Sequence, residues 1–404
     1  MAIKSVNSST AKTSFNEAIT VEKTTIFDLK PQYGGSMIRD NITASINGGT
    51  IAELDGELTL LTTTNTVSIA QVDSVQRGVY IAGKSAECGI GFRYPANPTG
   101  TIVAEWGLLN DANGYYFGID STSRFVAVRR NSVNTVIRQS SWNLDRMDGT
   151  GISGVNLTNF TNIGLIYQIR FTWYGYGGVV FQILIPGVLE DRLIEVHRYR
   201  PTAGINSTID PNLPIRVKVS NNGTATSFNA FVGGRQYSVF GKFNPQNRTT
   251  TAYRLNTSTT SGLWFPVIIW RLKTLFNGRS NSISSAPGGF TAQSSSRPHI
   301  VGLFLEDINI VTTGAFVQPP LVPTNESGLE VNITATDYTP SANAYLMYTS
   351  AFERSGAATD TSFQDLQTQF SNIPINKHLI FALQPLGGAN GVVDIATFNM
   401  IERR

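Results

Sequence analysis

An aspartate- and glycine-rich stretch in the middle of the chain is the first place where the sequence could carry chemistry. Asp145, Asp148 and Ser153 offer oxygen atoms of the kind that calcium binds. Their spacing departs from the alternate-residue pattern of calcium loops, and no glutamate follows at the distance of the last ligand. The glycine run 149–154 precedes neither a Lys-Ser/Thr pair nor a predicted helix, as a phosphate-binding loop would. The stretch therefore favours a structural turn, with no metal, cofactor or catalytic residue.

Three carboxylates in the same half of the chain could act in glycoside hydrolysis. They are Glu105, Asp111 and Asp120. That reaction needs two carboxyl groups on either side of the bond that is cleaved. The sequence places no two of them across a cleft, and β-sandwiches also bind sugars without cleaving them. We therefore expect a protein without enzymatic activity.

An aromatic cluster at Trp173, Tyr174 and Tyr176 is the candidate contact surface of the chain. Aromatic rings of this kind could stack against a sugar or contact a partner protein. The alternative is packing at the tip of a β-hairpin. Alternating apolar runs lie on both sides of a glycine-aromatic turn within residues 167–183, which predicts such a hairpin.

The composition limits the classes of partner. Charged residues make up 15% of the 404 residues, against roughly 25% in an average soluble protein, and the net charge is +3. Arginine pairs, such as Arg198 with Arg200, are scattered and form no basic stripe, so we expect solvated charge and no direct nucleic-acid contact. A single cysteine, Cys88, and three distant histidines argue against a zinc site. Because no signal peptide or membrane span is recognisable, we expect no membrane contact and a reducing compartment.

Strand-forming runs recur along the chain, with glycine, asparagine and proline between them, which predicts an all-β antiparallel β-sandwich. Residues 1–75 have fewer aromatic residues and predict an extended N-terminal arm or a small β-module. The segment 277–298 is rich in serine and glycine and predicts a mobile loop or an insertion. Apolar residues at helical spacing predict a helix over 362–370 in a small, β-rich C-terminal domain. The predicted division is an arm or module over 1–75, a sandwich over 76–315, a proline-rich linker over 316–323 and the C-terminal domain over 324–404.

A longer pattern joins the glycine-rich stretch to the hairpin. Residues 142–154 read W-N-L-D-R-M-D-G-T-G-I-S-G, and residues 169–177 read I-R-F-T-W-Y-G-Y-G. Together they resemble a pattern found in structural proteins of tailed phages and large DNA viruses. The resemblance covers roughly residues 76–310. The chain departs from the pattern at Tyr176, where a smaller apolar residue is expected between the glycines.

This resemblance implies a concanavalin-like or jelly-roll sandwich in a virion, as a minor capsid, decoration, fibre or tail component. We expect a non-enzymatic structural protein, assembled in the host cytoplasm through its arm and its sandwich surfaces. Its partners would be other virion proteins and further copies of itself, for example in a trimer. The alternative is a receptor- or carbohydrate-binding module at a fibre or spike tip. Such a module would contact a host glycan through Tyr174 and Tyr176 or through the segment 277–298.

Overall fold

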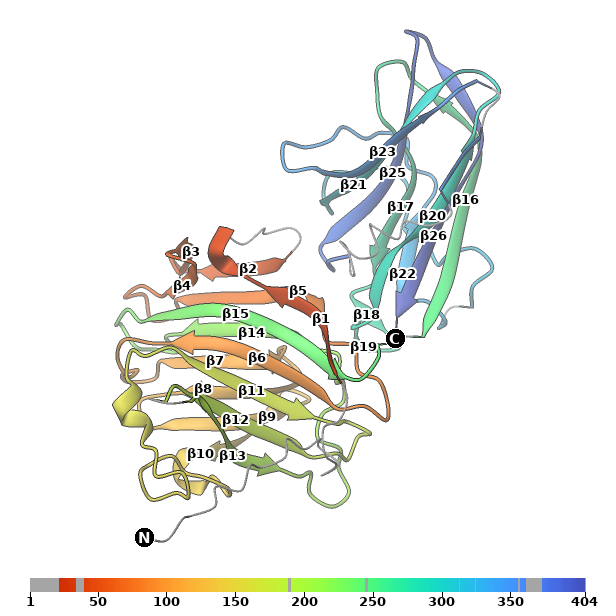
Figure 1. Cartoon of the computed structure of the whole chain (residues 1–404). Helices are drawn as coiled ribbons and strands as arrows, with labels where there is room; N and C mark the ends of the chain where they lie inside the picture. The colour runs from red at the N-terminus through yellow and green to blue at the C-terminus, as the bar shows by residue number, and fades with distance from the viewer. Residues whose placement is uncertain are drawn as a thin grey trace. The chain divides into compact units, whose positions relative to one another are not determined.

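The computed structural model describes residues 22–33, 40–187, 190–243, 246–311, 313–323, 325–354, 357–360 and 373–403. Nearly all regular structure in these residues is β-strand, and the chain divides into two units, Met1–Asn244 and Pro245–Arg404 (Figure 1). No helix in the described residues is long and apolar enough to span a membrane. The described helices are three short 3-10 helices: η1 (Pro31–Tyr33), η2 (Gln139–Ser141) and η3 (Leu157–Phe160).

Two antiparallel sheets form the first unit (Figure 1). The eight-stranded sheet runs in the order β13 (Arg192–Tyr199), β12 (Val179–Ile185), β11 (Leu165–Phe171), β6 (Ala86–Arg93), β15 (Asn229–Phe240), β4 (Glu57–Leu61) and β3 (Thr50–Leu54), with β1 (Lys23–Leu29) also paired to β15. The seven-stranded sheet runs in the order β10 (Val133–Arg138), β9 (Arg124–Arg130), β8 (Gly114–Ile119), β7 (Val103–Leu109), β14 (Pro214–Ser220), β5 (Ile69–Arg77) and β2 (Asn41–Ile46).

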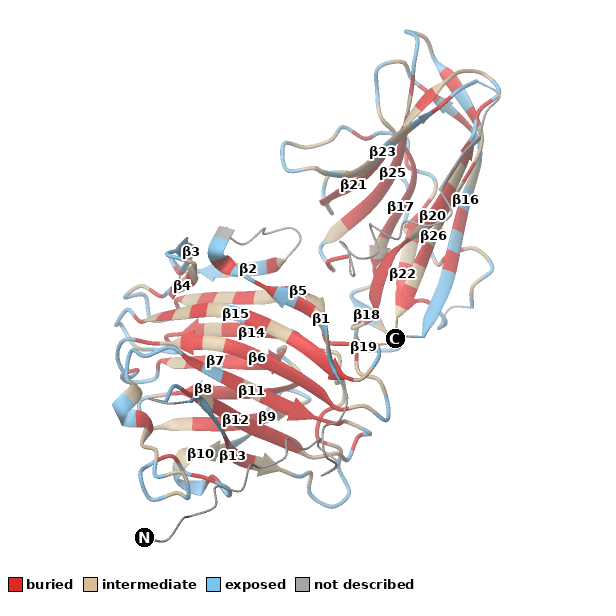
Figure 2. Ribbon diagram, in the orientation of Figure 1, coloured by how far each residue is buried: buried red, intermediate tan, exposed pale blue. Residues whose placement is uncertain are grey.

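The core of this unit lies between the two sheets. Alternate side chains of β11 point into it, as the two-residue period of a strand requires, and Figure 2 shows how much of the central strands is buried. Aromatic rings fill the middle of the core: Phe92 stacks on Trp106 with ring centroids 4.0 Å apart, and Tyr167 meets Trp106 edge-on at 5.0 Å. Burying each large apolar side chain stabilises the fold by about 2–3 kcal/mol.

Consecutive strands often lie in opposite sheets. Strand β5 pairs with β2 and β14 in one sheet, whereas the next strand, β6, pairs with β11 and β15 in the other. Strands β14 and β15 repeat this change of sheet. Such crossing between two antiparallel sheets is the jelly-roll arrangement. The predicted fold class, an all-β jelly-roll or concanavalin-like sandwich, is confirmed.

The second unit is also a pair of antiparallel sheets. One contains β16 (Asn247–Thr259), β26 (Gly391–Arg403), β20 (Ser284–Gln293) and β24 (Ala357–Asp360). The other contains β22 (Leu329–Asn332), β17 (Phe265–Leu272), β25 (Lys377–Pro385), β21 (His299–Asp307) and β23 (Tyr345–Phe352), and a two-stranded ribbon joins β18 (Leu275–Phe276) to β19 (Arg279–Ser280). Phe381 of β25 lies 5.1 Å from Phe290 and 5.3 Å from Phe398, between ring centroids, so the two larger sheets pack face to face.

The predicted separation of residues 1–75 is wrong for the part that the structure describes. Strands β1 to β5 are members of the two sheets of the sandwich. Phe27 and Leu60 are buried in the common core, and β1 pairs with β15 across more than 200 positions of sequence. The prediction relied on the low aromatic content of this segment. Its aliphatic side chains, such as Leu60 and Val72, are nevertheless buried in the common core. The predicted arm before residue 22 lies outside the described residues.

The predicted boundary after residue 315 is also wrong, because the second unit begins at Pro245. The segment 316–323 lies within that unit and does not link two domains: Val317 forms a β-bridge with Val331, and Phe316 packs on a buried cluster. Most of the segment 277–298, predicted as a loop, forms β19 and β20. The reason is non-local pairing, since β26 at the end of the chain pairs with both β16 and β20. The predicted helix over 362–370 lies outside the described residues.

Candidate functional site

The aspartate-rich stretch is a closed loop. Asp145 is 4% exposed, and its carboxylate accepts hydrogen bonds from the backbone N–H of Met147 at 2.8 Å and of Ser153 at 2.7 Å. A Cβ atom on Gly151 would lie 2.0 Å from Asp145 Oδ1, so only glycine fits at this position. Among the described residues no group of three or more histidine, cysteine, aspartate or glutamate side chains could hold a metal ion. The carboxylate therefore organises the backbone of the loop.

The beginning of this loop also covers the edge of the eight-stranded sheet. The backbone N–H groups of Leu144 and Asp145 both donate to the carbonyl of Val196 in β13, at 3.2 and 3.1 Å. Asn143 makes two side-chain bonds to the backbone of Arg198, one as donor and one as acceptor, each at 2.9 Å. These bonds cover the unpaired edge of β13, so that the loop lies beside the last residues of this strand.

The tip of the β11–β12 hairpin has a fixed shape. Tyr174 adopts φ 38°, and Gly175 follows with φ 81°, so two consecutive residues are left-handed. The N–H of Gly177 donates to the carbonyl of Trp173 at 2.8 Å, and a Cβ atom on Gly177 would lie 1.7 Å from the carbonyl oxygen of Thr172. Tyrosine seldom occupies the left-handed region, and such strain is kept where surrounding contacts impose it.

The three predicted contact residues have different environments. Trp173 is half-buried: its ring meets Tyr80 edge-on at 5.9 Å, and its Nε1 donates to the carbonyl of Thr208 at 3.1 Å. The side chain of Tyr174 is 53% exposed, while its N–H donates to the hydroxyl of Tyr80 at 3.2 Å. Tyr176 is 76% exposed. The structure therefore gives Trp173 a packing role and leaves the two tyrosines accessible.

Two arginines lie beside Tyr176. Arg198 lies near the end of β13 and Arg200 directly follows the strand, and both line two open surface depressions, of about 280 Å³ and about 500 Å³. We call these two depressions and their lining the tyrosine–arginine site. The smaller depression is lined by Tyr176, Gly178, Val180, Arg198 and Arg200, and the larger by Asn143, Leu144, His197, Arg198, Tyr199 and Arg200.

Glu195 holds Arg198 in position. A β-bulge opposite Phe181 and Gln182 brings Glu195 and Arg198 to the same face of β13, and Arg198 Nη2 lies 3.3 Å from Glu195 Oε2. The other oxygen, Oε1, accepts from Arg170 Nη2 at 2.7 Å and from Gln182 Nε2 at 3.3 Å. Burial lowers the pKa of the Arg170 guanidinium, although the nearby Glu195 carboxylate partly opposes this effect. This part of the outer face thus combines the Glu195 carboxylate with the guanidinium groups of Arg170 and Arg198, and Glu87 on β6 adds a second carboxylate opposite Arg170.

The histidine of the site contributes no charge at neutral pH. His197 is buried, and this burial lowers the pKa of its imidazole below the usual range. Its Nδ1 accepts the backbone N–H of Asn143 at 3.3 Å, which assigns the ring proton to Nε2. The positive charge of the site therefore comes from its arginines. Sequence reasoning missed them because each arginine pair was judged by its number of charges, whereas the pairing of β12 with β13 is what brings Arg198 and Arg200 beside Tyr176.

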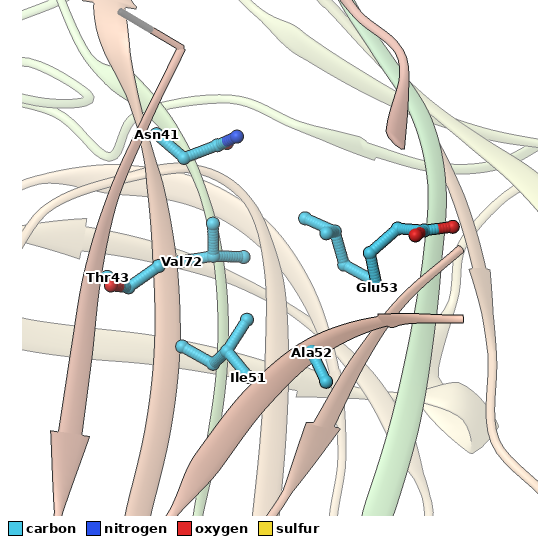
Figure 3. Close-up of a pocket in the computed structure, with 7 residues that line it drawn as sticks. Asn41, Thr43, Ile51, Ala52, Glu53 and Val72 are labelled. Atoms are coloured by element: carbon cyan, nitrogen blue, oxygen red, sulfur yellow. The ribbon is translucent and has the colours of Figure 1, made fainter. Parts of the chain in front are cut away.

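Two further hollows lie elsewhere in the first unit. A cavity of about 200 Å³ lies between β2 and β5 on one side and β3 and β4 on the other (Figure 3). Its floor includes Ile51 and Val72, and the Glu53 carboxylate at its rim points away and accepts from the N–H of Gly56 at 2.9 Å. A groove of about 440 Å³ crosses the outer face of the eight-stranded sheet beside Gln168 and Gln236. Neither hollow combines an exposed aromatic ring with charged groups on one face.

The three carboxylates considered for glycoside hydrolysis are all engaged by arginine. Burial raises the pKa of Asp111 and of Asp120, but the opposing effects together outweigh it, so the pKa of both carboxyls is lowered. Arg216 is the main opposing group at Asp111, and Arg138 with the backbone N–H groups of Ser123 and Thr122 at Asp120. A general acid needs the opposite shift. The pairs are Glu105 with Arg129 at 3.0 Å, Asp111 with Arg216 at 2.5 Å and Asp120 with Arg138 at 2.6 Å.

No protein-family model and no curated protein matches this sequence. Among solved structures, the chain is similar to a legume lectin-like domain from Entamoeba histolytica, with 10% identity and a TM-score of 0.33 over 51% of this chain and 92% of that one. It is similar to arcelin-5, a lectin-like defence protein from Phaseolus vulgaris, with 9% identity and a TM-score of 0.34 over 54% and 99%. It is also similar to a protein of unknown function from Shewanella oneidensis MR-1, with 10% identity and a TM-score of 0.34 over 58% of this chain and 91% of that one. The likeness concerns the β-fold alone.

Proposed function

We propose that the chain is a non-enzymatic glycan-binding protein and that the sugar binds at the tyrosine–arginine site. The observation that carries the proposal is the Tyr176 ring, which is 76% exposed at the mouth of an open depression that Arg198 and Arg200 also line. The apolar face of a sugar ring can stack on such an aromatic ring, while guanidinium donors bind its oxygen atoms. The hairpin tip supports this role, because its backbone is already ordered around Tyr174 and Gly177 and loses little conformational entropy on binding.

Tyr176→Ala is expected to weaken glycan binding roughly fivefold while leaving the thermal unfolding of the chain unchanged. The side chain makes few contacts within its own fold, so its loss should affect the ligand and not the sandwich. A glycan array would find the ligand, and calorimetric titration would give the affinities of the wild type and the variant.

Tyr253→Ala is the matched control for this experiment. Tyr253 is also an exposed tyrosine on a strand, at 45%, but it lies on β16 in the second unit. Equal affinity of Tyr176→Ala and Tyr253→Ala for the same saturable ligand would contradict the proposed site. Release of free sugar during the titration would contradict the absence of catalysis.

Assembly into a virion is a second candidate function, and one surface favours it. Strand β16 is a 13-residue edge strand of the four-stranded sheet, with Tyr253 and Leu255 exposed at 45% and 52%. Exposed edges of this length can pair with a strand of another subunit. The proposal predicts that the chain is present in purified virus particles and self-associates in solution. A strictly monomeric chain that is absent from particles would contradict it.

A further inference from the structure

We propose that the glycan bound at the tyrosine–arginine site is anionic, with a carboxylate or sulfate group that Arg198 and Arg200 bind. This inference rests on the proposed function and adds the chemical class of the ligand. Both guanidinium groups line both depressions, and no aspartate or glutamate lines either of them. A negative group is therefore the ligand that this surface complements.

The two arginines differ in their hydrogen-bond and ion-pair partners. Arg198 is partly neutralised by Glu195, whose carboxylate is itself shared with Arg170. Arg200 is exposed and has no hydrogen-bond or ion-pair partner among the residues that the structure describes. A guanidinium group is a planar fork that binds carboxylate or sulfate oxygens through two parallel hydrogen bonds. Arg200 is thus the group with unused donors, and Arg198 is the fixed one beside it.

Further positive charge lies behind the site. Arg130 faces Tyr199 closely enough to oppose the rise in the Tyr199 pKa that burial causes, and its Nε donates to Asn206 at 2.8 Å. Because burial lowers the pKa of His197, the imidazole is neutral at pH 7 and adds nothing to the positive charge of the site. Arg198 and Arg200 line the depressions and Arg130 acts on Tyr199 behind them, against the one carboxylate bonded to Arg198. An anion therefore gains electrostatic attraction here, whereas a neutral sugar gains only hydrogen bonds.

The size of the site favours a saccharide over a nucleic acid. Arg198 and Arg200 are two positions apart, and two positions of chain span at most about 7 Å, enough to hold one charged group or two on neighbouring sugar rings. Nucleic-acid surfaces combine long basic grooves with several stacked aromatic rings. Here one exposed ring, Tyr176, accompanies the arginines, and the net charge of the whole chain is only +3.

Arg200→Gln tests the inference in the full-length chain. The probes are hyaluronan oligosaccharides for carboxylate, heparin oligosaccharides for sulfate and neutral dextran oligosaccharides of similar length. We expect one anionic series to bind at least tenfold more tightly than dextran, and Arg200→Gln to remove about tenfold of that affinity. Added salt should weaken the binding. Which series binds distinguishes carboxylate from sulfate.

Arg192→Gln is the charge-matched control, because Arg192 is an exposed arginine at the other end of the same strand. Equal loss in both variants would mean non-specific attraction and would overturn the inference. Dextran binding that needs Tyr176 but not Arg200 would overturn it while leaving the proposed function intact. Binding to none of the probes and to no array glycan would overturn both. Equally tight, Arg200-dependent binding of a single-stranded oligonucleotide would overturn the saccharide class.

Discussion

Asp145→Ala is expected to lower the free energy of unfolding of the first unit by about 3 kcal/mol. The carboxylate is almost fully buried and accepts two backbone hydrogen bonds, from Met147 and Ser153. Its removal leaves both N–H donors without their acceptor, and Met147 is itself fully buried. The loop would then release its hold on Val196 in β13, which loses the cover along its edge.

Asp148→Ala is the matched control for this loop. Asp148 is three positions away and belongs to the same sequence pattern, but its carboxylate is exposed and bonds only to the neighbouring Thr150. Urea unfolding of the full chain, with hydrogen exchange to follow each unit, would measure both variants. A similar stability in Asp145→Ala and Asp148→Ala would contradict the role of Asp145. A loss seen only when calcium is present would instead make the loop an ion site.

The parts of the fold that follow from local pattern were predictable from the sequence. The hairpin at 167–183 was predicted from two alternating apolar runs around glycines, and β11 and β12 pair there in register from Phe171 with Val179 to Ile166 with Leu184. The structural reading of the 142–154 stretch came from ligand spacing alone, and the bonds made by Asp145 give it a physical basis. Both features depend on residues close together in the chain.

Features that depend on distant pairing were not predictable. The second unit begins with β16, which pairs with the last strand across about 140 residues, and the Asn-Pro pair at 244–245 marks a turn without distinguishing it from the other turns of the chain. The proline-rich segment at 316–323 has the composition of a linker, but Val317 finds a β-bridge partner in Val331. Tyr176 and Arg200 come together only because β12 and β13 are neighbours in the sheet.

The second unit is expected to lose stability in mild acid through His378. This side chain is 1% exposed, and neither ring nitrogen has a hydrogen-bond partner among the described residues. Its ring centroid lies 4.7 Å from that of Phe316, and the Arg271 guanidinium lies over the same phenyl ring, 4.0 Å from its centroid. Burial first, and the positive charge of Arg271 second, lower the pKa of His378 to about 4. The nearest carboxylate on the adjacent strand, Glu306, is already bonded to Ser341 and to Tyr338.

The sign of the pH effect follows from this lowered pKa. Above pH 6.5 the imidazole is neutral in both the folded and the unfolded chain, and it has no effect on stability. Between pH 6.5 and about 4 the unfolded chain takes up a proton that the folded chain does not, so the free energy of unfolding falls. At pH 5 the loss from this one group is about 2 kcal/mol.

His378→Leu should remove most of this acid sensitivity, because leucine fills a similar volume without a titrating group. Thermal unfolding of the wild type and of the variant at pH 8 and at pH 5 would measure it, and the difference between the two proteins cancels groups that titrate in both. The variant should be close to the wild type at pH 8 and more stable by about 2 kcal/mol at pH 5. Parallel pH profiles for the two proteins would show that the pKa of His378 is the same in the folded and the unfolded chain, and would contradict the prediction. An imidazolium paired with Glu306 would instead raise this pKa, and the wild type would gain stability relative to the variant as the pH falls.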